Sequence, residues 1–250
     1  MDPKGKTALV TGGAVRVGKA ITLALARAGA NVVINYHSSA AAAEETAVTA
    51  QSFGVGALPI QADIGNAEQV AAMVTAAKAQ FGSVDILINN ASLWRQTPFP
   101  TDNFDDWHLI TNVLINGAFY CANAVAPLML ERGEGAIVNI IDLSVYEPWP
   151  NYTAHAVGKS ALLAMSRQLA LELAPAVRVN AVAPGPVLPP LDFSEEKIAQ
   201  TAAKTLLNRW GIPEDVADAV LFFVQAGYVT GELLAVDGGQ RFGHRKHDHG

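Results

Sequence analysis

The chain has 250 residues, half of them apolar, and a formal net charge of −6. This length can bury one large core, so we expect a single domain over residues 1–243 followed by a polar, disordered tail over 244–250. Acidic and basic residues are interspersed, which argues against a nucleic-acid partner or an anionic membrane surface. We expect no signal peptide and no apolar run long enough to span a membrane. Cys121 is the only cysteine, so no intramolecular disulfide can form, and a cytoplasmic protein is expected.

Short, β-branched apolar runs alternate with longer segments of helical periodicity along the whole chain. The runs predict strands at 7–11, 31–35, 57–61, 84–89, 136–141, 177–181 and 233–236. Helices are predicted at 18–28, 40–53, 67–81, 105–131 and 152–173. Most of the strands are apolar on both faces, as in a parallel sheet covered by helices on each side. The sequence therefore predicts an α/β fold, a doubly wound Rossmann sheet of about seven strands.

Residues 183–193 contain four prolines and predict a stiff, non-helical segment after the sixth strand. Open α/β folds bind ligands at the carboxyl edge of the sheet, where this segment belongs. We expect the substrate to meet residues of the loops at this edge, namely Arg16, Ser92, Trp94, Trp149 and Leu188. Three histidines in the tail lack a scaffold that would fix them, so no metal site is predicted.

A glycine-rich loop, residues 11–18, follows the first strand and opens the first helix. Gly12 and Gly13 permit a tight turn, and Gly18 lets the helix pack closely against the strand. The free N–H groups at the start of the helix suit a pyrophosphate. A lone loop of this kind is a weak signal, but its position between a strand and a helix favours dinucleotide binding.

Five further motifs occur in a fixed order after this loop. They are Asn89-Asn90-Ala91-Ser92, Lys159 in a long helix, Ala183-Pro184-Gly185, Tyr228-Val229-Thr230-Gly231 and Val236-Asp237-Gly238-Gly239. With the loop, they resemble the short-chain dehydrogenase/reductase family over essentially the whole chain. Arg16 and the sequence Asn90-Ala91-Ser92 look like the pteridine reductase and dihydromonapterin reductase branch. The resemblance implies a reductase of small molecules that assembles as a homotetramer through the two longest helices.

The end of the second strand carries no Asp or Glu that would accept from the ribose hydroxyls of NAD. Arg16 and the polar residues there offer positive charge and donors to a 2′-phosphate, so NADP(H) is the expected cofactor. The expected cofactor-binding residues, several of them implied by the resemblance, are Gly12, Arg16, Val17, Gly18, Asn35, Tyr36, His37, Ser38, Ser39, Asp63, Ile64, Asn90, Ala91, Ser92, Lys159, Pro184, Gly185 and Val187.

The resemblance also implies a catalytic set of asparagine, serine, tyrosine and lysine, and this chain departs from it at three positions. Lysine is present as Lys159, which should hold the nicotinamide ribose. Asp142 stands where serine is expected, as in the pteridine reductase branch. Leu114 replaces the asparagine, and His155 replaces the tyrosine that donates the proton. Asn112 and Asn116 flank Leu114, but two residues along an α-helix turn by about 200°, so neither takes its place without a shift of register.

His155 leaves three alternatives for the proton. To donate, the ring must be an imidazolium, which the charge of Lys159 disfavours and pairing with Asp142 favours. Alternatively, Tyr152, on the same helix face, or water supplies the proton. In the third alternative the chain binds NADPH without efficient turnover, as a sensor or an assembly partner. The expected function is therefore an NADPH-dependent reductase with an atypical site, and the alternative is a catalytically impaired NADP(H)-binding protein.

Overall fold

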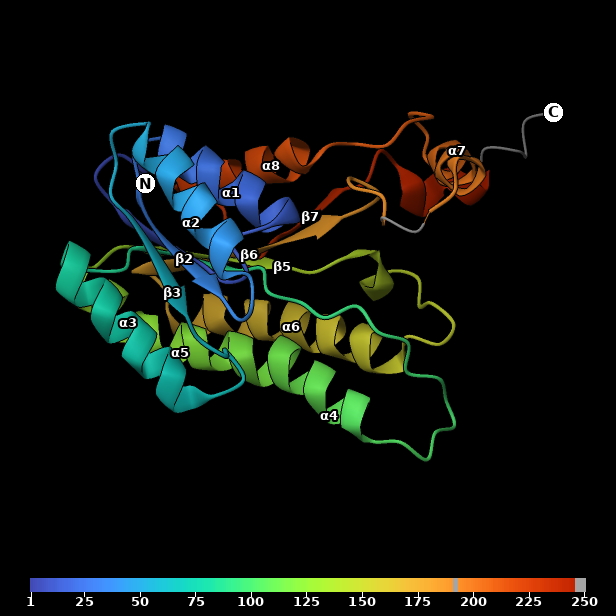
Figure 1. Ribbon diagram of the computed structural model, residues 1–250, viewed down its shortest axis with the longest axis horizontal. Helices are drawn as coiled ribbons and strands as arrows, with labels where there is room; N and C mark the ends of the chain where they lie inside the picture. The colour runs from blue at the N-terminus through green and yellow to red at the C-terminus, as the bar shows by residue number, and fades with distance from the viewer. Residues whose placement is uncertain (191–192, 246–250) are drawn as a thin grey trace.

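The computed structural model describes residues 1–190 and 193–245. Its centre is a seven-stranded parallel sheet of order β3-β2-β1-β4-β5-β6-β7 (Figure 1). The strands are β1 Thr7–Val10, β2 Asn31–Tyr36, β3 Ala57–Gln61, β4 Ile86–Asn89, β5 Gly135–Ile140, β6 Val177–Pro184 and β7 Leu233–Val236. Every residue of β1, β4 and β5 is buried, because helices cover both faces of the sheet. The predicted doubly wound α/β fold is confirmed.

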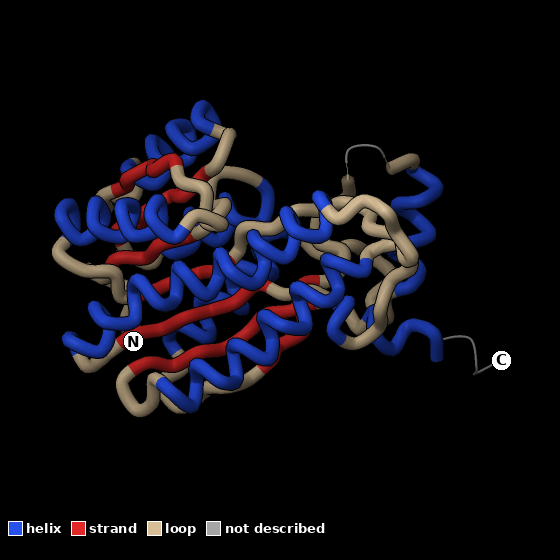
Figure 2. Tube along the Cα trace, turned by 90° about the horizontal axis from the view of Figure 1, so that it is seen from below, coloured by secondary structure: helices blue, strands red, loops and turns tan. Residues whose placement is uncertain are grey.

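Helices cover the two faces of the sheet in separate layers (Figures 1 and 2). One layer contains α1 Arg16–Arg27, α2 Ala40–Gln51 and α8 Pro213–Gln225. The other contains α3 Ala67–Phe81, α4 Asp105–Thr111, α5 Ala118–Arg132 and α6 Thr153–Glu172. Helix α7, Glu195–Lys204, has no buried residue and lies beyond the carboxyl end of the sheet. The chain also contains two short 3-10 helices, η2 Leu143–Val145 and η3 Gln240–Arg245. Residues 246–250 of the predicted tail lie outside the described residues.

The predicted single α-helix over 105–131 is wrong in one respect. A π-helix, η1 Asn112–Gly117, interrupts it between α4 and α5. The whole stretch Asp105–Arg132 is 28 residues long with a mean hydropathy of 1.6 in its most apolar window. By length and composition it could therefore cross a membrane, contrary to our expectation. It packs against α3 and α6 instead, so we interpret it as a core helix of the domain.

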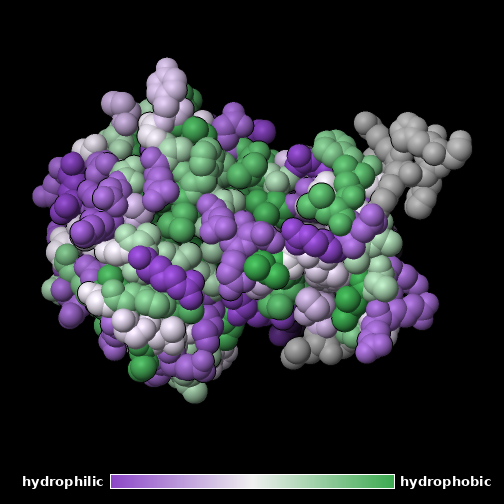
Figure 3. All heavy atoms as spheres, turned by 90° about the horizontal axis from the view of Figure 1, so that it is seen from above, coloured by the Kyte–Doolittle hydropathy of each residue, from purple (hydrophilic) through white to green (hydrophobic). Residues whose placement is uncertain are grey.

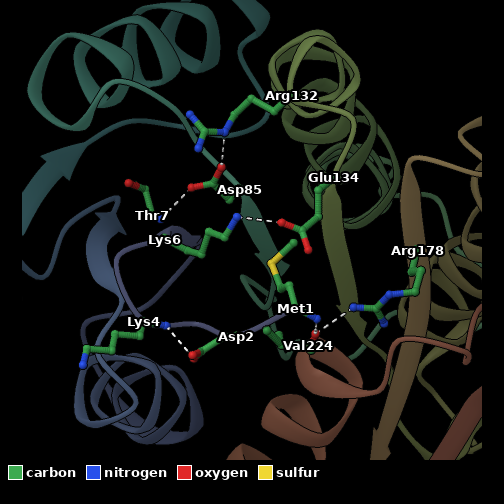
Figure 4. Close-up of polar contacts among 10 residues, drawn as sticks. All are labelled: Met1, Asp2, Lys4, Lys6, Thr7, Asp85, Arg132, Glu134, Arg178 and Val224. Atoms are coloured by element: carbon green, nitrogen blue, oxygen red, sulfur yellow. Dashed lines mark hydrogen bonds and ion pairs between the residues drawn. The ribbon is translucent and has the colours of Figure 1, made fainter.

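Ion pairs and hydrogen bonds gather at the amino ends of the strands (Figure 4). Lys6 pairs with Glu134 at 2.6 Å, and Arg132 Nε contacts the Asp85 carboxylate at 2.9 Å. The same carboxylate accepts from the main-chain N–H of Thr7 at 2.9 Å. These contacts tie the starts of β1, β4 and β5 together. They leave the opposite, carboxyl edge of the sheet free for a functional site.

The outer surface over α1, α2 and α8 mixes hydrophilic and hydrophobic residues (Figure 3). No large continuous hydrophobic area covers this face in the view.

Candidate active site

A cleft of about 700 Å³ opens at the carboxyl ends of β1, β2 and β4. It combines the glycine-rich loop, the end of β2, the segment after β3 and the segment after β4. Its walls are formed by Gly12, Ala14, Val15, Arg16, Val17, Gly18, Asn35, Tyr36, His37, Ser38, Ser39, Ala62, Asp63, Ile64, Asn90, Ala91, Ser92, Leu93, Trp94, Arg95, Leu109 and Val113. Most of the residues expected to bind the cofactor therefore lie together in one cavity.

The glycine-rich loop is held in a shape that only glycine permits at two positions. Gly12 has a φ of 60°, in the left-handed region. A Cβ at Gly18 would collide with the carbonyl oxygen of Gly12. Asn90 closes the loop from the other side, because its Nδ2 donates to the carbonyls of Thr11 and Gly12 at 2.9 and 3.1 Å. Helix α1 then begins with no side-chain cap and no acidic residue in its first turn, which fits a pyrophosphate.

The end of β2 forms one wall of the cleft. Its lining residues His37, Ser38 and Ser39 bring no carboxylate. Arg16 lines the same cleft, with a left-handed φ of 53°. Its Nη2 donates to the carbonyl of Leu188 at 3.2 Å. This hydrogen bond links the cofactor loop to the proline-rich segment after β6.

Asp63 contributes to the wall through a local turn. Its Oδ1 accepts from the N–H of Gly65 at 2.8 Å, while Asn66 is the residue that caps α3. Asn35 is buried and joins two walls, since it accepts from Gly12 N and donates to Ala62 O. The cleft is thus fixed by buried polar contacts.

Asp142 and His155 form a close pair at the carboxyl end of β5. The distance from His155 Nε2 to Asp142 Oδ2 is 2.5 Å, and the two side chains are 3% and 15% exposed. The other ring nitrogen, Nδ1, lies 3.3 Å from the carbonyl oxygen of Leu93. Asp142 Oδ1 also accepts from both the N–H and the hydroxyl of Ser144. The sequence could not identify Leu93, because its contribution is a main-chain carbonyl.

Lys159 lies one helical turn after His155 and is 3% exposed. Its Nζ donates to the carbonyl of Ile140 at 2.8 Å. Burial lowers the pKa of Lys159 from its usual 10.5, and the carboxylate of Asp142 opposes part of this change. Burial raises the pKa of Asp142, but the hydrogen bond from His155 and the charge of Lys159 outweigh it, so the net change from 3.8 is downward.

Leu114, in the π-helix, fills the position expected for asparagine with an apolar side chain. It is 1% exposed, and a Cβ at Gly158 would lie only 2.7 Å from its Cδ1. The flanking asparagines do not substitute for it. Asn112 donates to the carbonyl of Gly65, and Asn116 donates to Asn112. The shift of register that a π-helix introduces therefore does not bring an amide to this position.

Aromatic rings surround His155. Trp94 lies with its ring centroid 4.4 Å from that of Tyr152, 4.9 Å from His155 and 5.4 Å from Trp149. Trp149 also stacks on His155 at 6.2 Å. Trp94 is 56% exposed and lines the cleft, so it presents an open indole to a ligand. Two of the residues expected at the substrate mouth, Trp94 and Trp149, thus lie beside His155.

Some expected site residues lie off the wall of the cleft. Pro184 is the last residue of β6, and the N–H of Gly185 donates to the carbonyl of Val236. Val187 is buried against the core and lines another cavity. Sequence reasoning also missed Arg95, Leu109 and Val113, which line the cleft. No motif marks these three residues. Among the residues that the structure describes, no group of His, Cys, Asp or Glu could hold a metal ion.

Comparison with known proteins identifies the family of this chain. A family model described as "Enoyl-(Acyl carrier protein) reductase" matches residues 13–241. The chain belongs to the short-chain dehydrogenase/reductase family. It is 36% identical over 248 residues to 3beta-hydroxysteroid dehydrogenase 1 of Eggerthella lenta, covering 95% of this chain and 94% of the relative. It is 34% identical to the 3-oxoacyl-[acyl-carrier-protein] reductase of Synechocystis sp., covering 94% and 96%.

A crystal structure of acetoin dehydrogenase YohF from Salmonella typhimurium superposes with a TM-score of 0.87 at 35% identity, covering 95% of this chain and 96% of that one. Short-chain dehydrogenases and reductases use nicotinamide cofactors. By their names, these three relatives concern steroid, acyl-carrier and acetoin chemistry. The comparisons therefore establish an oxidoreductase of this family and do not single out the pteridine reductase branch.

Proposed function

We propose that the protein is an NADP(H)-dependent reductase of a small molecule, with an Asp142–His155 pair in place of the family's serine and tyrosine. One observation carries the proposal. The end of β2 presents His37, Ser38 and Ser39 with no carboxylate, and Arg16 lines the same cleft. A 2′-phosphate would meet donors and positive charge there, without repulsion.

The chain supplies binding, orientation and a proton. The bound cofactor supplies a hydride from C4 of its nicotinamide to a C=O or C=N carbon of the substrate. Gly12, Gly18 and the start of α1 would hold the pyrophosphate, and Asp63 and Ile64 would line the adenine pocket. Lys159, fixed through Ile140 O, would hold the nicotinamide ribose. The Asp142–His155 pair, at 2.5 Å, would complete the reaction with a proton.

The substrate class follows from the exposed face of Trp94. Its indole lines the cleft and packs against the rings of Trp149 and Tyr152. Offset stacking on such a ring favours a flat, conjugated substrate. Pterins are the first candidates, because Arg16, Ser92 and Asp142 resemble the pteridine reductase branch. The names of the relatives make ketones and 3-oxoacyl thioesters the necessary comparison.

The test is NADPH oxidation, followed at 340 nm, against pterins, quinones, ketones, 3-oxosteroids and 3-oxoacyl thioesters. Cofactor binding is titrated in parallel. The proposal expects turnover with at least one flat substrate and faster turnover with NADPH than with NADH. Tight NADPH binding without turnover on any of these substrates would instead support the second candidate function.

That second candidate is an NADP(H)-binding protein with little catalysis, acting as a sensor or an assembly partner. Two observations favour it. Leu114 places a buried apolar side chain where the family has a polar group. His155 is almost completely buried, and both of its ring nitrogens already contact acceptors. The substrate panel separates the two functions directly.

The assembly and the compartment remain proposals as well. Phe119 and Leu130 of α5 are 47% and 49% exposed, and Val157 and Leu171 of α6 are 43% and 74% exposed. Such apolar side chains suit contacts between copies in a homotetramer. Burial raises the pKa of the Cys121 thiol to about 12, so this thiol is unreactive. A reducing cytoplasm fits a chain whose one cysteine is buried.

A further inference from the structure

The protonation state of His155 follows from its two neighbours. Nδ1 faces the carbonyl oxygen of Leu93 at 3.3 Å, and Nε2 faces a carboxylate oxygen of Asp142 at 2.5 Å. A carbonyl and an ionised carboxylate can only accept hydrogen bonds. Both ring nitrogens must therefore carry a proton if both contacts are hydrogen bonds. A neutral ring would leave one nitrogen lone pair against an acceptor lone pair in a buried site.

The charges around the ring are consistent with an imidazolium. Asp142, at the end of β5, is the carboxylate in contact with it. Lys159, on the same helix, is the nearby cation, and its charge acts on Asp142. The ring of His155 also contacts the rings of Trp94 and Trp149. Asp142 thus interacts with both Lys159 and His155, and its second oxygen is fixed by Ser144.

Access to this proton is possible from one direction. The His155 side chain is 3% exposed and the Asp142 side chain 15% exposed, so the carboxylate is the more open end of the pair. Leu114 packs against Gly158, the residue before Lys159, and belongs to a small apolar cluster with Ile110 and Ala154. The described polar contacts therefore lead from His155 to the more exposed carboxylate of Asp142 and on to Ser144.

From this geometry we infer that the proton for the reduction is stored on His155 and reaches the substrate through the carboxyl group of Asp142. The inference rests on the proposed function. The substrate carbon receives the hydride with both of its electrons, so the protein has to supply only a proton. The Nε2–H bond breaks as an Oδ2–H bond forms, giving a neutral imidazole and a carboxylic acid. The Oδ2–H bond then breaks as an O–H or N–H bond forms on the product.

The carboxylate of Asp142 is restored by this sequence, and His155 ends neutral. It takes up its next proton from water, again through Asp142. His155 therefore acts through Asp142, and Asp142 is the group that faces the substrate. The bond from Nδ1–H to Leu93 persists throughout and fixes the tautomer of the neutral ring.

The test uses the Asp142→Asn variant of the whole protein. Its amide can still accept from Ser144 and can donate to a neutral His155, so the shape of the site is kept while the carboxylate is lost. Nitrogen-15 spectra of labelled histidine at pH 7 should show both nitrogens of His155 protonated in the wild type. The resonance is assigned by its absence in His155→Gln. In Asp142→Asn the ring should become neutral, with one protonated nitrogen.

Turnover provides the second readout. Asp142→Asn should lower kcat at least 100-fold, on the order of the contribution of general acid catalysis, with the Kd of NADPH unchanged within twofold. Asp105→Asn, the same change at an exposed position of α4, should leave kcat unchanged. A neutral His155 in the wild type at pH 6–7, or full kcat in Asp142→Asn, would overturn the inference. If the wild type oxidises no NADPH, the proposed function fails, while the spectra still test the charge of His155.

Discussion

Replacing Arg16 by alanine should remove most of the preference for NADPH over NADH. Arg16 is the one arginine that lines the cleft on the glycine-rich loop, and its guanidinium now donates to the neutral carbonyl of Leu188 at 3.2 Å. In the NADPH complex we expect it to bond to the 2′-phosphate instead. Alanine at this position keeps a Cβ, so the left-handed φ of 53° is equally unfavourable in both proteins. Any difference in cofactor binding between the two proteins therefore comes from the guanidinium side chain and not from the backbone.

The size of the effect follows from the bond that is exchanged. A hydrogen bond to a charged group contributes about 1.5–3 kcal/mol, and a neutral one about 0.5–1.5 kcal/mol. When Arg16 exchanges its hydrogen bond to Leu188 for one to the 2′-phosphate, the binding free energy of NADPH improves by about 1–1.5 kcal/mol. This difference corresponds to roughly tenfold in affinity. NADPH should bind the wild type at least tenfold more tightly than NADH, and Arg16→Ala should reduce the ratio to about two or three. The affinity for NADH should change little.

Nicotinamide fluorescence titration measures both affinities in one buffer, and added salt should weaken NADPH binding more than NADH binding. Arg95→Ala is the matched control, because Arg95 also lines the cleft but is paired with Asp106 at 2.9 Å. This control should keep the tenfold ratio. Equal affinities in the wild type, or an unchanged ratio in Arg16→Ala, would refute the assignment of the 2′-phosphate site.

Four other predictions follow from the site and the fold. Gly18→Ala should abolish detectable NADPH binding, because the added methyl group meets the carbonyl of the glycine-rich loop; calorimetry tests this. Asp142→Ala should destabilise the protein at pH 7 by about 3–5 kcal/mol, because a buried cation loses its partner. Since the pKa of Asp142 is lowered from 3.8 in the folded state, its contribution is present at neutral pH and is lost as the pH falls through that lowered value. Denaturant unfolding at pH 7 and pH 3 measures both effects, and equal losses at the two pH values would contradict them. His155→Tyr should change the pH dependence of turnover, because a phenol replaces the imidazole; identical pH profiles in the two proteins would exclude His155 and point to Tyr152, tested by Tyr152→Phe. Light scattering at micromolar concentration should give a tetramer, and Leu171→Glu should weaken it, whereas a stable monomer would refute the assembly.

The sequence predicted the parts of the fold that depend on local patterns. Apolar runs located all seven strands to within a few residues, because strands buried on both faces leave a continuous signal. The glycine-rich loop was placed correctly, since its glycines are required by a left-handed turn and a close backbone contact. The pairing of Asp142 with His155 was also anticipated, because thirteen residues separate two positions that the family brings together.

The π-helix and the main-chain acceptors of the site could not be predicted, because no residue pattern in the sequence indicates them. The π-helix around Leu114 changes the backbone register without any proline or glycine signal at its start. The acceptor at Leu93 is a main-chain carbonyl, and the partner of Arg16 is another, 172 residues away. Only the three-dimensional arrangement shows that both nitrogens of His155 face acceptors. That observation changed the expected role of His155 from direct donor to proton store.

The most direct test of the account is the rate of NADPH oxidation by the wild type and by Asp142→Asn, measured on the same substrate panel with matched cofactor occupancy. We expect the wild type to turn over at least one flat carbonyl or imine substrate. Asp142→Asn, with the same affinity for NADPH, should be at least 100-fold slower. A wild type that binds NADPH but oxidises it no faster with any substrate than without one would contradict the reductase assignment.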